Sequence, residues 1–182
     1  MNATATERDI VQDPLYSRTA CWGGVALMFG LTVLMFIDTL GGSRILSRVQ
    51  LDLFTQYFYW RKFGFEELAG GNLALWNPYV VGGVPFFGGF QSALLYPPNW
   101  LHLILPIGAA INVIIALHVF LMGLFTYLWA WRRGLSMPAS LLAGVMMMFG
   151  GPHFLHIFAG HLSNLCVMPW VPAVLLCIDE VF

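Results

Sequence analysis

Long stretches without a charged residue restrict most strongly what this chain can fold into. No Asp, Glu, Lys or Arg occurs between Glu67 and Arg132, and none between Arg133 and Asp179. A soluble domain carries roughly 25% charged residues, whereas this chain has 9% charged and 59% hydrophobic residues. Because about 20 apolar residues in a helix cross a bilayer, we expect an all-α integral membrane protein with about four transmembrane helices.

The apolar runs place the expected helices. They lie at 21–38, 104–131, 135–149 and 165–178, after an N-terminal tail at 1–20. The third ends at a Gly-Gly-Pro sequence, because glycine is flexible and proline lacks an amide donor. Two prolines interrupt the fourth, so neighbouring helices must supply partners for the freed backbone groups.

Two loops and an orientation follow from this arrangement. We expect a long outer loop at 39–103 and a second outer loop at 150–164. Arg132 and Arg133 occupy the shortest loop, and such basic pairs favour the cytoplasmic side. The N-terminus is therefore expected in the cytoplasm and the chain forms a single membrane domain. The basic residues of the long loop carry little weight, since loops of about 60 residues or more follow this rule poorly.

Composition also excludes several functions. The net charge of -1 and the pI of about 6.5 give no basic excess for nucleic acid. Cys21, Cys166 and Cys177 lie in apolar runs without the spacing of a disulfide framework or a zinc site. We therefore expect membrane lipid as a partner, no nucleic acid, and no metal-ligand set.

An amphipathic helix is predicted at 51–69 in the long loop. Apolar and aromatic side chains at helical spacing share one face: Phe54, Tyr57, Phe58, Phe65 and Leu68. Polar side chains share another: Asp52, Gln56, Tyr59 and Glu66. Such a helix lies flat at the membrane surface. It can be a purely structural brace at the interface, or it can carry a functional site.

Asp52 is the candidate for chemistry. Near the start of a helix, exposed amides favour the ionised carboxylate. An interfacial carboxylate can deprotonate a sugar or lipid hydroxyl, or hold a divalent cation that binds a phosphate. Arg61 and Lys62 lie about two to three turns further on and suit a phosphate leaving group.

Histidines form the other polar groups of interest. His153, His156 and His161 cluster in the expected second outer loop, on the same side as Asp52. They suit a metal or phosphate site, or interfacial hydrogen bonding. His118 lies within the second expected helix, where it can bind a pigment or form a structural hydrogen bond between helices.

Four motifs follow one another in the long loop. Asp52 precedes Gln56-Tyr57, then come GNLALWNPY at 71–79, GGVPF at 82–86 and QSALLYPPN at 91–99. This order resembles the YfhO-like polytopic bacterial membrane proteins, which are grouped with the GT-C glycosyltransferases. The later GHLSN at 160–164 is also similar to that family.

The resemblance implies a glycosyltransferase of the bacterial cytoplasmic membrane, acting at the cell envelope. It implies a polyprenyl-phosphate sugar donor and an extracytoplasmic acceptor, with Asp52 as the catalytic base or a cation-linked residue. The other expected substrate-binding residues are Gln56, Arg61, Lys62, Trp76, Asn77, Gln91 and His161. Family members are several times longer, so this chain corresponds to their N-terminal portion.

A second hypothesis is a non-catalytic accessory or scaffold subunit of a larger membrane complex. The glycine and proline positions in the expected helices suit lateral contacts, because small residues let helix backbones approach closely.

Overall fold

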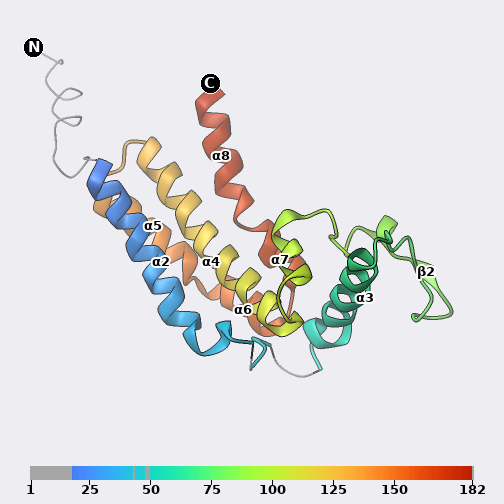
Figure 1. The fold of residues 1–182 in the computed structure, drawn as a ribbon. Helices are drawn as coiled ribbons and strands as arrows, with labels where there is room; N and C mark the ends of the chain where they lie inside the picture. The colour runs from blue at the N-terminus through green and yellow to red at the C-terminus, as the bar shows by residue number, and fades with distance from the viewer. Residues whose placement is uncertain (1–17, 43, 48–49, 182) are drawn as a thin grey trace, which may run out of the picture. The chain divides into compact units, whose positions relative to one another are not determined.

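The computed structural model describes residues 18–42, 44–47 and 50–181, and these are mostly helical (Figure 1). The α-helices are α2 (Arg18–Leu40), α3 (Phe58–Ala69), α4 (Ile107–Arg132), α5 (Met137–Met148), α6 (Gly151–Ala159), α7 (Leu162–Val167) and α8 (Trp170–Val181). A π-helical turn, η2 (Leu53–Tyr57), precedes α3. Between α3 and α4 lie β1 (Trp76–Asn77), β2 (Val84–Pro85) and the 3-10 helices η3 (Phe87–Gly89) and η4 (Pro97–Leu103).

Four helical stretches in the described residues are long and apolar enough to cross a membrane: Cys21–Leu40, Ile107–Arg132, Met137–Ala159 and Leu162–Val181. The predicted helices at 21–38 and 104–131 agree with the first two. The second begins slightly later than expected, at Ile107. Pro106 directly precedes it, and a proline disfavours the helical conformation in the residue before it.

The loop expected at 150–164 is instead mainly helical. The Gly-Gly-Pro sequence does end α5, but α6 starts at Gly151 with Pro152 in its first turn. Proline fits there because a first-turn amide has no partner within the helix. A tight turn at Gly160 (φ +78°) then separates α6 from α7. The expected break at the prolines is present between α7 and α8.

The helix predicted at 51–69 is present as η2 followed by α3. Its expected apolar face is the inner one: Tyr57 and Phe65 are buried, while Gln56, Tyr59 and Glu66 are exposed. The location of this helix at a membrane surface stays a prediction.

The chain divides into two compact units. The helix unit comprises 18–35, Val119–Gly150 and 168–181. The loop unit comprises Phe36–His118 and Gly151–Val167, and it includes the long loop between α2 and α4.

In the helix unit, α4 and α5 make a close backbone contact. A Cβ added at Gly144 of α5 would lie 2.8 Å from the carbonyl oxygen of Gly123 and 3.2 Å from Cβ of Tyr127. Small residues at both positions therefore allow the two helices to meet.

Ion pairs join the C-terminal ends of α4 and α8 in the helix unit. Arg133 donates to both carboxylate oxygens of Asp179, at 2.6 and 2.9 Å, and Trp129 Nε1 donates to the same carboxylate at 2.8 Å. Arg132 lies 2.8 Å from Glu180. Asp179 and Glu180 at the end of α8 are thus each paired with an arginine that follows or ends α4.

The α2 and α4 helices differ in how much of their surface is covered. In the most apolar stretch of α4, 67% of residues are buried, against 22% in α2. Along α2, Trp22, Phe29 and Leu34 remain 71%, 58% and 69% exposed. An uncovered apolar surface of this kind requires lipid or a partner to cover it.

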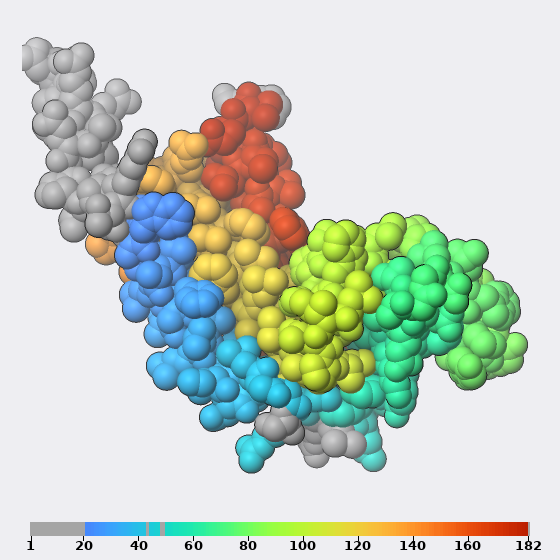
Figure 2. All heavy atoms as spheres, in the orientation of Figure 1, coloured from blue at the N-terminus to red at the C-terminus, as the bar shows by residue number. Residues whose placement is uncertain are grey.

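In the loop unit, α3 packs on the loop that follows it (Figure 2). The buried centre of this contact is Phe65, Ala74, Phe86 and Leu94. Gly64 is required there, because a Cβ would lie 2.8 Å from both Leu94 and Phe86. The short antiparallel pair of β1 and β2 sets Trp76 opposite Pro85 and Asn77 opposite Val84.

A buried asparagine secures the chain where it leaves α2. Asn112 of α4 donates to the carbonyl oxygens of Thr39 and Arg44, at 2.6 and 2.5 Å, and accepts from the amide of Leu46 at 3.1 Å. Both ends of the side-chain amide therefore have partners, as burial of a polar group requires.

We expect Gly144→Ala to destabilise the protein by about 1–3 kcal/mol, because the added methyl overpacks the contact with α4. Gly30→Ala in α2 is the matched control, since a Cβ there meets nothing within 4 Å and alanine favours a helix. Thermal unfolding of the two purified variants measures the difference. Equal melting temperatures would contradict the close contact.

The expected topology places Val81 outside and Ser136 in the cytoplasm. Val81 is 93% exposed and Ser136 is also exposed. In a chain with Cys21, Cys166 and Cys177 replaced by serine, we expect Val81→Cys to react with a membrane-impermeant maleimide in intact cells. Ser136→Cys should react only after permeabilisation. The reverse pattern would show that the orientation is wrong.

Candidate functional site

A carboxylate and two imidazoles meet in the loop unit. Oδ2 of Asp52 lies 3.4 Å from Nε2 of His161, and Nδ1 of His161 lies 2.9 Å from Nδ1 of His156. The side chains of His161 and Asp52 are 39% and 48% exposed, so a substrate can reach them. Two residues predicted from distant regions of the sequence to act at one site are therefore adjacent.

The tight turn at Gly160 brings these groups together. A Cβ added at Gly160 would lie 2.6 Å from the amide nitrogen of Leu53 and 3.1 Å from Oγ of Ser47. The turn between α6 and α7 thus lies directly against the start of η2. The amide of His161 also donates to the carbonyl of His156 at 3.0 Å, which holds the two histidines on one turn.

The two histidines are joined by one hydrogen bond between their rings. A neutral imidazole carries one N–H group and one acceptor nitrogen. One of the two Nδ1 atoms therefore donates and the other accepts. Asp52, His161 and His156 form a series in which the carboxylate lies 3.4 Å from His161 and the two rings share a hydrogen bond of 2.9 Å.

The other two histidines do not join this series. His153 is buried, and neither of its ring nitrogens has a hydrogen-bond partner among the described residues. His118 contacts the carbonyl of Ile114 through Nδ1 and the hydroxyl of Tyr96 through Nε2, both at 2.6 Å. These contacts support a structural hydrogen-bonding role for His118.

Within the described residues, no group of three or more His, Cys, Asp or Glu side chains is placed to hold a metal ion. Asp52, His161 and His156 lie in a series and do not surround a common point. The divalent cation considered from the sequence stays a prediction, and no chemical step is assigned to it below.

Arg61 has a position that differs from the one expected of a substrate ligand. It is 1% exposed, and its Nη1 donates to the carbonyl of Gln91 at 2.9 Å and to that of Ser92. Burial lowers the pKa of Arg61 to about 10, so the side chain remains a cation at neutral pH. Arg61 therefore fixes the loop to α3, and Gln91 contributes its backbone while its side chain is exposed.

Trp76 and Asn77 shape the short hairpin. Oδ1 of the buried Asn77 accepts from the amide of Tyr79 at 2.9 Å, which stabilises the turn. A Cβ at Gly83 would lie 2.5 Å from Nε1 of Trp76, so the indole rests directly on this glycine.

A groove of about 880 Å³ collects three of the predicted binding residues: Gln56, Lys62 and Asn77. The same groove is lined by Tyr59 and Glu66 of the predicted polar face, and by residues that the sequence did not single out: Trp60, Phe63, Glu67 and Tyr79. Aromatic faces beside amide and carboxylate groups are the surfaces that a carbohydrate needs for stacking and for hydrogen bonds to its hydroxyls. The signal for Phe63 was its helical spacing with Tyr59 and Glu66.

In comparisons with known proteins, no family model, no curated protein and no solved structure matches this chain. The resemblance to the YfhO-like proteins rests on the four loop motifs and stays a prediction.

We expect Gly160→Ala to separate Asp52 from His161, because the methyl would collide with Leu53. Gly82→Ala is a matched control: both glycines have φ of +78°, but a Cβ at Gly82 meets nothing within 4 Å. The positive φ costs both variants about 1–2 kcal/mol, and the collision adds about 1–3 kcal/mol to Gly160→Ala alone.

Hydrogen exchange of the peptide covering 51–57, together with the melting temperature, measures the difference. Faster exchange there in Gly160→Ala, but not in Gly82→Ala, is the expected result. The same exchange in both variants would show that the turn does not hold η2 in place.

Proposed function

We propose that this chain is the N-terminal portion of a polytopic membrane glycosyltransferase. It transfers a sugar from a polyprenyl-phosphate donor to an extracytoplasmic acceptor, in the bacterial cytoplasmic membrane. The observation that carries the proposal is the pairing of the accessible Asp52 carboxylate with His161. The resemblance assigns catalysis to Asp52, and His161 is one of the seven expected substrate-binding residues.

Asp52 is the general base in this proposal. Its carboxylate accepts the proton of an acceptor hydroxyl while the hydroxyl oxygen forms a bond to the anomeric carbon of the sugar. The bond from that carbon to the donor phosphate breaks, and its electron pair remains on the phosphate oxygen. His161, whose Nε2 lies 3.4 Å from Oδ2 of Asp52, helps to hold the carboxylate in place.

The groove on α3 also supports the proposal, because its lining suits a saccharide. Gln56 lies one turn after Asp52 on the same helical segment and lines this groove. Trp60 and Tyr79 offer aromatic faces, and Glu66 and Glu67 offer hydrogen-bond acceptors. A saccharide held there would approach the segment that carries the base.

The membrane setting is supported by the four long apolar helices and by the uncovered apolar surface of α2. A polyprenyl donor dissolves in the bilayer, so an enzyme that uses it must present its carboxylate at the lipid surface. A carboxylate at the start of an interfacial helix meets this requirement.

The test is sugar transfer by the intact gene product in proteoliposomes. A panel of radiolabelled polyprenyl-phosphate hexoses serves as donors and a bacterial envelope extract supplies acceptors. We expect Asp52→Asn to lower the transfer rate by about 100-fold or more, because general-base catalysis typically contributes at least that factor.

Asp38→Asn is the matched control, because it removes an exposed carboxylate at the end of α2 and should leave transfer unchanged. Transfer that is equally fast in Asp52→Asn would contradict the proposal. It would favour an accessory subunit of a larger membrane complex.

A further inference from the structure

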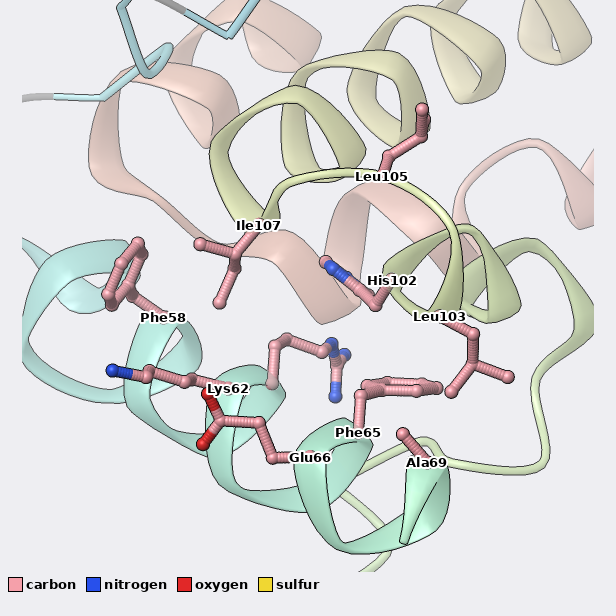
Figure 3. Close-up of a pocket in the computed structure, with 10 residues that line it drawn as sticks. Phe58, Lys62, Phe65, Glu66, Ala69, His102, Leu103, Leu105 and Ile107 are labelled. Atoms are coloured by element: carbon pink, nitrogen blue, oxygen red, sulfur yellow. The ribbon is translucent and has the colours of Figure 1, made fainter.

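A second cavity, of about 320 Å³, lies beside α3 (Figure 3). Figure 3 shows the side chains of α3 on one side of it, and His102, Leu103 and Ile107 on the other. Asp52, His161 and His156 do not line this cavity, although Lys62 and Glu66 line both it and the groove. The cavity is therefore separate from the carboxylate proposed for catalysis.

The cavity contains a buried cation without a counter-ion. Arg61 lines it and is 1% exposed, yet no carboxylate of the described residues lies within ion-pair distance of its guanidinium. Two loop carbonyls accept hydrogen bonds from Nη1, but Nε is buried and has no partner in the described segments of the chain. An unpaired buried charge is costly, so an anion from outside would stabilise this arrangement.

Further groups in the cavity favour an anion. Lys62 adds a second positive charge, and Glu66 is the one acidic residue in the lining. Both ring nitrogens of His102 are buried without a partner among the described residues. Burial and the charge of Arg61 lower the pKa of His102 to about 4, so at neutral pH it is uncharged and offers one N–H donor.

The remaining walls are apolar. Phe58 and Phe65 of α3 and Ile107 at the start of α4 line the cavity, and the ring of Phe65 lies 5.0 Å from that of His102. An inorganic ion would gain nothing from these walls, whereas the carbon chain of a lipid would bury apolar surface against them.

We infer that this cavity binds the phosphate group of an anionic membrane lipid, with Arg61, Lys62 and His102 as its donors. The guanidinium edge that includes Nε matches two oxygens of a phosphate in a fork. The lipid supplies the missing counter-ion of Arg61, and its carbon chain lies along the apolar walls. The inference goes beyond the proposed transferase activity and does not depend on it.

Native mass spectrometry of the intact, delipidated protein in detergent tests this inference. The probes are phosphatidic acid, oleic acid as a carboxylate lipid, and inorganic phosphate. We expect one phosphatidic acid to bind at least about tenfold more tightly than either other probe. Binding of oleic acid at equal strength would overturn the assignment to phosphate, and equally tight inorganic phosphate would overturn the assignment to a lipid.

Two variants place the bound lipid. Lys62→Gln removes a charge, and His102→Phe removes the donor while keeping a ring against Phe65. We expect each to weaken phosphatidic acid binding by about tenfold, the effect of losing a hydrogen bond to a charged group. Arg61 is left intact because it also fixes the loop after α3.

Arg44→Gln is the matched control, because Arg44 is exposed and lies outside the cavity lining. It should bind phosphatidic acid as the unmodified chain does. Unchanged binding in both cavity variants, with melting temperatures equal to that of the unmodified chain, would overturn the inference. Sugar transfer is not measured, so this failure would leave the transferase proposal unaffected.

Discussion

The burial of a single guanidinium organises the loop unit of this protein. Arg61 lies on the inner face of α3 and donates to the carbonyls of Gln91 and Ser92, so it joins the helix to the loop between η3 and η4. Hydrogen bonds from a cation are stronger than those between neutral groups, whereas Asn99 and Trp100 of η4 donate to the loop carbonyls of Ala93 and Leu94. The groove and the phosphate cavity both use α3 as a wall. The positions of both therefore depend on this interaction.

The helices could be predicted from the sequence because length and apolar character determine them. The prediction of a loop at 150–164 was wrong because Gly-Gly-Pro, which does end α5, also starts α6, since proline is suited to a first helical turn. Arg61 was assigned from its residue type to a substrate. Its position gives the better prediction: with Tyr57 and Phe65 it forms a row at intervals of four residues, and both of those neighbours are buried.

Only part of the candidate site could be predicted from the sequence. The sequence placed Asp52 and His161 on the same side, and they lie 3.4 Å apart. Their partner His156 was one of three candidate histidines, and only the turn at Gly160 selects it over His153. Hydropathy and spacing cannot reveal such a choice, because it depends on where a turn packs against a segment far away in the sequence. Trp76 and Asn77 show the same limit, since their roles in the hairpin arise from Gly83 and Tyr79.

The π-helical turn at Leu53–Tyr57 affects how this protein can change during evolution. Such turns accommodate one more residue than an α-helical turn, and they are associated with functional sites. Deleting one residue from 53–57 would restore ordinary helical spacing and rotate Asp52 by about 100° relative to α3. The carboxylate would then leave His161 while Arg61 and the rest of α3 kept their places. A relative with the three later loop motifs but one residue fewer between Asp52 and Phe58 would retain the scaffold and lose the pair.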